Sequence, residues 1–195
     1  MVCVGITGGI GSGKTLVCRI LEILGVPVYN ADLKARMLMN THSGLITGIR
    51  ELFGNDAYHG GELDRKYLAS RVFGDEEMLR SLNRMVHPVV REDFMTWAGK
   101  QSGVPYVVEE AAILFESGAD RFMDCKVLVY APREVRISRV MGRDRVSREE
   151  VIRRMSHQWD DEDKRSMADE VIRNDGSQML LPQILRLHEK LCNGK

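Results

Sequence analysis

Residues 8–15 read Gly8-Gly9-Ile10-Gly11-Ser12-Gly13-Lys14-Thr15 and fit the pattern G-x-x-x-x-G-K-[ST] without a mismatch. They follow an apolar segment, residues 2–7, that predicts a buried strand. They precede a segment whose apolar side chains recur at helical spacing. Glycines allow positive φ angles, so successive backbone N–H groups can turn inward and form an anion-binding concavity, to which the helix start adds its dipole. This arrangement predicts a site for the phosphates of a nucleoside triphosphate.

Two side chains at the end of this phosphate loop (residues 8–15) supply chemistry. Lys14 is placed to reach the β- and γ-phosphates, and the Thr15 hydroxyl can ligate a bridging Mg²⁺. The alternative is a glycine turn that only links a strand to a helix, but such a turn rarely needs four glycines and a Lys-Thr pair. We therefore predict a nucleotide site formed by Gly9, Ile10, Gly11, Ser12, Gly13, Lys14, Thr15 and Leu16.

Length and composition limit the classes of protein. A chain of 195 residues suits one α/β core with one or two insertions. The formal net charge of zero argues against a broad basic surface for nucleic acid. The four cysteines are scattered, which indicates small buried residues in a reducing compartment rather than a zinc site. No apolar run approaches membrane-spanning length, so we expect a cytoplasmic protein with no membrane partner.

A carboxylate follows the second predicted strand, residues 26–29. Asp32 stands at the carboxyl end of this strand, the edge of a parallel sheet where ligands bind. The alternative is that Asp32 caps the helix over residues 33–39, and the two roles are compatible. Arg36 lies four residues further on, so it shares a helix face with Asp32 and could hold this acid or an anionic substrate.

Residues 43–102 contain no convincing strand and predict a helical insertion. Within it, the His87-Pro88 pair is expected to break a helix, because proline biases the preceding residue toward an extended conformation. His87 could contact substrate, but a lone histidine is more often structural.

A third strand is predicted over residues 104–108, with Glu109 and Glu110 at its carboxyl end. One of these acids could reach Mg²⁺, directly or through water. A fourth strand is predicted over residues 125–130, and a last strand at Val171-Ile172 is followed by a final helix over residues 180–191.

Residues 133–165 alternate charges densely. Arg136, Arg139 and Arg143 are spaced to share one helix face. The segment is either a solvated helical hairpin or a mobile lid that lowers arginines onto a transferring phosphate, and the upstream phosphate loop favours the lid.

Several motifs, in this order, resemble the dephospho-coenzyme A kinase family along essentially the full chain. The phosphate loop alone would not choose a family, whereas the later motifs together are far more specific. The chain departs from the usual family pattern at Asn30, where Asp is frequent, at Ala112, where Pro is common, and at Leu16, where Thr is common. The motifs are residues 7–15, Asn30-Ala31-Asp32-Leu33-Lys34-Ala35-Arg36, residues 82–88 ending in His-Pro, Ile113-Leu114-Phe115-Glu116, Arg139 with Arg143-Asp144, His157-Gln158, and residues 168–174.

The resemblance implies a P-loop NTPase fold like that of the nucleoside monophosphate kinases, with a five-stranded parallel sheet flanked by helices. It implies one domain of three parts: a core (about 1–30, 103–132 and 167–195), a helical acceptor-binding insertion (about 31–102) and a lid (about 133–166). The implied reaction is transfer of the γ-phosphoryl group of ATP to the ribose 3′-hydroxyl of dephospho-coenzyme A, the last step of coenzyme A synthesis. The partners are then these two small molecules with Mg²⁺, in a monomer or weak homo-oligomer.

Residue roles follow from the same resemblance. Asp32 would be the general base, Lys14 and Arg139 would act on the phosphates, and Arg143 and Asn174 would lie near the adenine of ATP. For Mg²⁺, the phosphate loop itself indicates Thr15, and of the two acids after the third strand we expect Glu110 to be the partner. The acceptor side would be lined by Asp32, Arg36, His87, Glu110, Leu114 and Glu116.

Three rival functions are weighed against this interpretation. A kinase for another small acceptor would have the same fold and phosphate loop. A nucleotide-switch protein needs Asn-Lys-x-Asp and Asp-x-x-Gly motifs, which the chain lacks. A nucleic-acid-handling ATPase is disfavoured by the neutral charge and by the absence of a basic, aromatic-interleaved segment.

Overall fold

The computed structural model describes residues 1–72 and 74–194, which form two compact units. The first unit contains Met1–Asn30 and the chain from Ala98 onward, and the second unit contains Ala31–Trp97. The segment predicted as a lid, residues 133–166, falls in the first unit.

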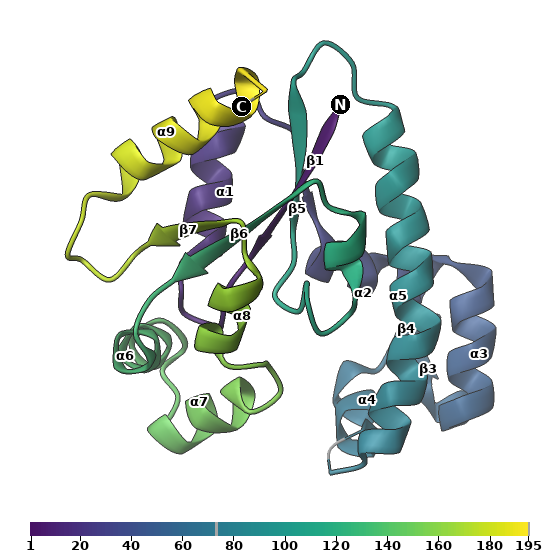
Figure 1. The fold of residues 1–195 in the computed structure, drawn as a ribbon. Coiled ribbons are helices and arrows are strands. Elements are labelled where there is room, and N and C mark those ends of the chain that lie inside the picture. Colours follow the sequence, from purple (N-terminus) through teal and green to yellow (C-terminus); the bar gives the residue numbers. More distant parts are fainter. Residues whose placement is uncertain (73, 195) are drawn as a thin grey trace. The chain divides into compact units, whose positions relative to one another are not determined.

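A five-stranded parallel sheet forms the centre of the first unit, in the order β2-β5-β1-β6-β7 (Figure 1). The central position of β1 follows from its apolar sequence, since Val4 and Ile6 are fully buried. Register pairs Ile6 and Asn30 with Glu110, so the carboxyl ends of β1, β2 and β5 meet at one edge. The strands are β1 Val2–Thr7, β2 Val28–Asn30, β5 Tyr106–Glu110, β6 Cys125–Tyr130 and β7 Glu170–Arg173.

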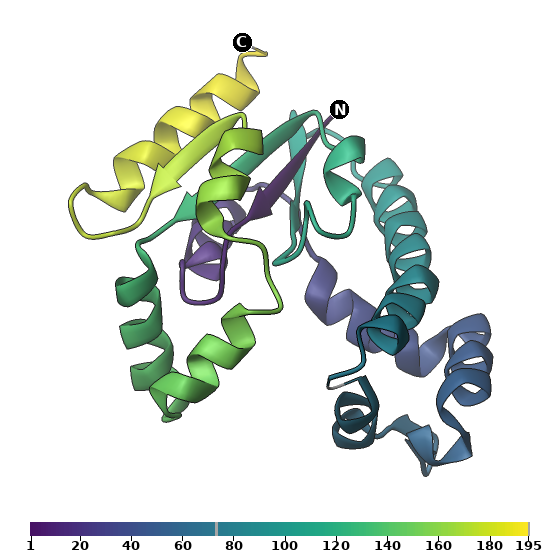
Figure 2. The same ribbon diagram turned by 60° about the horizontal axis from the view of Figure 1, so that its bottom comes forward.

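Helices cover both faces of this sheet (Figures 1 and 2). On one face, α1 and α9 pack their apolar sides against alternate strand residues such as Val4 and Val127. On the other face, α8 lies over β6. A small separate core of Ile137, Val140 and Val151 joins α6 to α7. The helices are α1 Lys14–Ile23, η2 Ala119–Phe122, α6 Arg133–Asp144, α7 Arg148–Met155, α8 Asp161–Met167 and α9 Leu180–Cys192.

The predicted five-stranded parallel architecture is confirmed, with changes at strand ends. β2 starts later than predicted and includes Asn30. Glu109 and Glu110 lie inside β5 rather than after it, because pairing with β1 and β2 extends the strand to Glu110. In the described part of the chain, no helix combines the length and the apolar character that crossing a membrane requires.

The second unit is mainly helical. Its helices are α2 Ala31–Thr41, α3 Ser43–Phe53, η1 Asn55–Ala57, α4 Arg65–Val72 and α5 Glu76–Gly99, which runs into the first unit at its end. Asp64 caps α4, accepting hydrogen bonds from the Lys66 and Tyr67 amides.

Two expectations for the second unit are wrong. Residues 58–63 contain a short antiparallel pair, β3 Tyr58–His59 and β4 Glu62–Leu63, where no strand was predicted. α5 continues through Pro88 instead of breaking at His87-Pro88. Burial of Val86, Val90 and Phe94 along the same helix outweighs the local loss of one backbone hydrogen bond.

Candidate active site

The phosphate loop connects β1 to α1 at the carboxyl edge of the sheet. Gly8, Gly11 and Gly13 have φ angles of 148°, 83° and 98°, values that L side chains rarely adopt. Gly13 is also limited by space, because a Cβ there would lie 2.2 Å from Asn174 Nδ2. The backbone conformation of the loop therefore explains why glycine occupies these three positions.

Lys14 is the first residue of α1 and folds back over the loop. Its Nζ donates to the Gly8 carbonyl at 2.5 Å and approaches the Gly9 carbonyl at 3.5 Å. The ammonium is therefore held above the concavity in which an anion would sit. The Leu16 side chain is half exposed, and its backbone N–H donates to the Gly13 carbonyl.

Thr15, Glu110 and Asn30 form a connected set of polar side chains at the sheet edge. Thr15 Oγ1 donates to Glu110 Oε1 at 2.8 Å, and Asn30 Nδ2 donates to Glu110 Oε2 at 2.9 Å. Both oxygens of the Glu110 carboxylate are thus oriented. A hydroxyl beside a carboxylate is a set of hard oxygen donors that suits Mg²⁺, which commonly takes one or two protein ligands and completes its shell with phosphates and water.

Two residues predicted to act on ATP contact the loop from outside. Asn174 Nδ2 donates to the Ser12 carbonyl at 2.8 Å, which ties the end of β7 to the phosphate loop. Arg139, exposed on α6, approaches the Gly11 carbonyl with Nη1 at 3.5 Å. Arg143 instead makes a bidentate pair with Asp144, at 2.7 and 3.1 Å, which raises the pKa of Arg143 and lowers that of Asp144.

Two residues predicted for the acceptor side are occupied by contacts within the first unit. Leu114 is fully buried against β1, where a Cβ on Gly5 would lie 2.7 Å from its Cδ2. Glu116 Oε1 pairs with Lys164 Nζ at 2.7 Å and accepts the Trp159 N–H at 2.9 Å. Leu114 is therefore a core residue in this structure, and Glu116 has a structural partner.

The remaining predicted residues belong to the second unit. Asp32 and Arg36 are exposed on α2, one turn apart. Because α2 begins at Ala31, Asp32 lies inside the first turn, where the helix dipole favours its charge, rather than at the N-cap. His87 is half-buried on α5, and this burial lowers its pKa.

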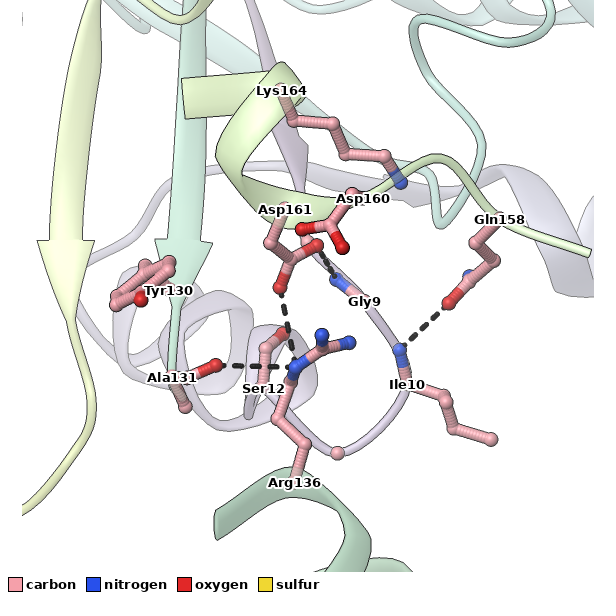
Figure 3. Close-up of polar contacts among 12 residues, drawn as sticks. Gly9, Ile10, Ser12, Tyr130, Ala131, Arg136, Gln158, Asp160, Asp161 and Lys164 are labelled. Atoms are coloured by element: carbon pink, nitrogen blue, oxygen red, sulfur yellow. Dashed lines mark hydrogen bonds and ion pairs between the residues drawn. The ribbon is translucent and has the colours of Figure 1, made fainter. Parts of the chain in front are cut away.

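Sequence reasoning missed a polar network beneath the loop, which Figure 3 shows. Asp161 accepts the Gly9 N–H and pairs with Arg136, Gln158 accepts the Ile10 N–H, and Lys164 is fully buried nearby. The acidic run 160–163 and the arginine-rich helix are visible in the sequence. No sequence signal distinguishes the buried acid in that run from its exposed neighbours.

The prediction of buried cysteines is only partly correct. All four cysteines are unpaired thiols, but only Cys18 is buried; Cys192 is exposed, 3.6 Å from His188 Nε2. The expectation of four buried cysteines is therefore wrong, because the last turn of α9 faces solvent at Cys192. Among residues 1–72 and 74–194, no group of three or more His, Cys, Asp or Glu side chains is arranged to hold a metal.

The chain is similar to known proteins over most of its length. The family model described as "Dephospho-CoA kinase" matches residues 2–179. A dephospho-CoA kinase of Bacteroides fragilis is 40% identical over 184 residues, covering 94% of this chain and 90% of the relative.

Two solved structures agree with that match over nearly the whole chain. A Thermus thermophilus protein, TT1252, has 39% identity and a TM-score of 0.85, with 95% of each chain covered. A dephospho-CoA kinase from Campylobacter jejuni has 25% identity and a TM-score of 0.72, with 98% of each chain covered. The similarity thus extends over the sheet, the phosphate loop and the helical segments alike.

Proposed function

The chain belongs to the dephospho-CoA kinase family, and we propose that the phosphate loop, a Mg²⁺ ion and Asp32 together carry out its reaction. That reaction is the ATP-dependent phosphorylation of the ribose 3′-hydroxyl of dephospho-coenzyme A. It gives coenzyme A and ADP and is the final step of coenzyme A biosynthesis. The observation that carries the proposal is the pairing of Thr15 with Glu110 beside Lys14 at the carboxyl edge of the sheet.

ATP binds through the backbone and side chains of the phosphate loop. Lys14 moves from the Gly8 carbonyl to the β- and γ-phosphates when these arrive, since a phosphate oxygen is a stronger acceptor than a neutral carbonyl. The Gly9 and Ile10 amides already donate to protein side chains, and the Ser12 amide donates to the Gly9 carbonyl. The amides of Gly11, Gly13, Lys14 and Thr15 therefore contribute most to holding the phosphates.

Thr15 and Glu110 hold Mg²⁺, Thr15 directly and Glu110 directly or through water. Their oxygens, 2.8 Å apart, fit the ion's preference for hard ligands. When bound, Mg²⁺ neutralises charge on the β- and γ-phosphates. Asn30 keeps the Glu110 carboxylate turned toward Thr15 by donating to its second oxygen.

Asp32 accepts the proton of the 3′-hydroxyl as the oxygen of that hydroxyl attacks the γ-phosphorus and the bond to ADP breaks. Its exposure on the first turn of α2 leaves the carboxylate available to a substrate. Arg36, which shares a helix face with Asp32, and His87 contribute to binding of the acceptor, as do Glu110, Leu114 and Glu116. Of these, Leu114 contributes through packing, because it is fully buried.

Residues 133–166 act as a lid. Arg139 stabilises the charge of the transferring phosphoryl group, and its approach to the Gly11 carbonyl supports this role. Arg143 and Asn174 contact the adenine side of ATP. Closing the lid excludes water, which would otherwise compete with the acceptor for the phosphoryl group.

The chain acts as one kinase domain of core, insertion and lid, with boundaries near residues 30, 102, 132 and 166. It works in the cytoplasm as a monomer or weak homo-oligomer that binds neither nucleic acid nor membrane. Size-exclusion chromatography with light scattering measures the oligomeric state, and retention on single-stranded DNA at moderate salt would contradict the absence of a nucleic-acid partner.

The test is ADP formation from ATP and Mg²⁺ with dephospho-coenzyme A, adenosine, AMP or no acceptor. We expect strong stimulation by dephospho-coenzyme A alone, with coenzyme A as the product. Turnover with a different acceptor and none with dephospho-coenzyme A would overturn the assignment of the acceptor while leaving the kinase fold intact. Loss of activity in EDTA, restored by Mg²⁺, tests the metal separately.

A further inference from the structure

The first half of the phosphate loop is held by side chains that lie far along the chain. Asp161 Oδ1 accepts the Gly9 N–H at 2.9 Å, across 152 residues of sequence. Gln158 Oε1 accepts the Ile10 N–H at 2.9 Å, across 148 residues. Figure 3 shows both side chains reaching the loop from α8 and the segment before it. The N–H groups of two consecutive loop residues therefore donate to protein side chains in this structure.

The positive charge of Arg136 compensates for the buried carboxylate of Asp161 beneath the phosphate loop. A buried negative charge close to a phosphate site would be costly to bury and would repel the nucleotide. Arg136 Nε lies 3.4 Å from Asp161 Oδ2, and the side chains of both residues are less than a tenth exposed. Burial raises the pKa of Asp161, and the positive charge of Arg136 is the largest influence that opposes this. Arg136 Nε also donates to the Ala131 carbonyl at 3.1 Å, which fixes the guanidinium in place.

The loop rests directly on this guanidinium. A Cβ added to Gly9 would overlap Arg136 Nη1, so a larger residue there would displace the guanidinium from its present position. Gly9 thus donates its N–H to Asp161, and its Cα lies against the Arg136 guanidinium. The two charged groups fix the position of this peptide.

The segment that carries Asp161 is itself anchored on its other side. Lys164 Nζ pairs with Glu116 Oε1 at 2.7 Å and donates to the Ala112 carbonyl at 3.3 Å. Glu116 also accepts the Trp159 N–H at 2.9 Å. These contacts do not involve the phosphate loop, so they fix the position of Asp161 independently of the loop.

We infer that Asp161, neutralised by Arg136 and supported by Gln158, is a positioning residue that keeps the phosphate loop in its nucleotide-binding shape. The inference rests on the proposed function, because it assumes that this loop binds ATP. A loop already ordered before binding loses less conformational entropy when the phosphates arrive, so Asp161 strengthens nucleotide affinity without touching the nucleotide.

The test compares Asp161→Ala and Asp161→Asn with the control Asp163→Ala, an exposed acid on the same helix. ADP affinity is measured by calorimetry, the KM values for both substrates and kcat by kinetics, and stability by thermal unfolding. We expect Asp161→Ala to weaken ADP binding and raise the KM for ATP about ten-fold or more, because one hydrogen bond to a charged acceptor is lost. The KM for dephospho-coenzyme A should stay within about two-fold, since that substrate does not depend on the Gly9 amide.

Asp161→Asn separates the hydrogen bond from the charge. Its carbonyl oxygen can still accept the Gly9 N–H, so its loss of ADP affinity should be smaller than that of Asp161→Ala yet larger than that of Asp163→Ala. If the Asp161 variants bind ADP as tightly as Asp163→Ala and differ only in stability, Asp161 is merely structural and the inference is overturned. If Asp161→Ala does not fold, Asp161→Asn decides by the same comparison. Failure of the wild-type protein to bind ADP would instead refute the proposed function and, with it, this inference.

Discussion

Thr15 and Glu110 are joined by a hydrogen bond of 2.8 Å between Oγ1 and Oε1, although 95 residues separate them in the sequence. The pair brings the last residue of the phosphate loop to the carboxyl end of β5. One hydroxyl and one carboxylate therefore meet at the sheet edge where we propose that Mg²⁺ binds. The pairing also helps to compensate for the burial of the Glu110 carboxylate inside a strand, since both of its oxygens accept hydrogen bonds.

Glu110→Gln should raise the Mg²⁺ concentration needed for half-maximal activity by about ten-fold, because the charge that attracts the ion is removed. The measurement is a Mg²⁺ titration of ADP formation at saturating ATP. Glu22→Gln, an exposed acid on α1, removes the same charge away from the site and should leave the titration unchanged. Equal titrations for wild type and Glu110→Gln would exclude Glu110 from metal binding.

Asn30→Asp should destabilise the protein in the absence of metal and increase the stabilisation that added Mg²⁺ produces. The substitution puts a second carboxylate where Asn30 now donates to Glu110 at 2.9 Å, and two like charges at that distance repel. We expect a loss of roughly 1–2 kcal/mol at pH 7 in EDTA, partly recovered with Mg²⁺ and ADP. Thermal unfolding with and without the ion measures this, and the exposed Asn55→Asp serves as control. An unchanged melting temperature in EDTA would contradict the repulsion.

The phosphate loop could be predicted from sequence because its determinants are local. Glycines at 8, 11 and 13 and a lysine at the helix start encode the turn within a few residues. Strand β6 was predicted at its observed bounds for a similar reason, since the apolar run over residues 127–130 marks a buried parallel strand.

Long-range relationships could not be predicted in the same way. Asp161 lies in a run of acids that looks solvated, and its burial depends on Arg136 and on a loop amide 152 residues away. The helix through Pro88 is a second case, because tertiary burial of its apolar face overrides a local signal that is usually decisive.

Lys164→Met should lower the free energy of unfolding by about 3–5 kcal/mol, since it leaves the Glu116 carboxylate buried without its ion-pair partner. Lys164 is fully buried and lies 2.7 Å from Glu116. Adding Glu116→Gln to this variant should recover part of the loss, because the uncompensated charge is removed. Chemical denaturation of both variants measures the difference. Arg165→Met, which breaks an exposed pair with Glu162 and a cation–π contact with Tyr130, should have a much smaller effect. A double variant as unstable as the sum of the two single ones would show that the charges are not coupled.

Burial of His87 predicts a pH dependence of stability. Because burial lowers its pKa, the folded protein holds His87 neutral while the unfolded chain, with a pKa of about 6.5, takes up a proton first. Stability contributed in this way is present above pH 6.5 and is lost as the pH falls below that value. His87→Gln should therefore show a shallower loss of stability than wild type between about pH 7 and pH 5. Denaturation at several pH values measures the slopes, and parallel slopes would mean that His87 does not titrate differently in the folded state.

Asp32→Asn should separate catalysis from binding. The amide has the same shape as the carboxylate but cannot accept the 3′-hydroxyl proton, so kcat should fall by about 10²–10⁴-fold while ADP affinity and stability stay near wild type. The exposure of Asp32 on α2 makes a large folding defect unexpected. Asp56→Asn, an exposed acid of the same unit, should keep full turnover. If Asp32→Asn turns over at the wild-type rate, the proton must leave by another route. In that case the role of Asp32 is only to stabilise the first turn of α2, where its negative charge lies near the positive end of the helix dipole.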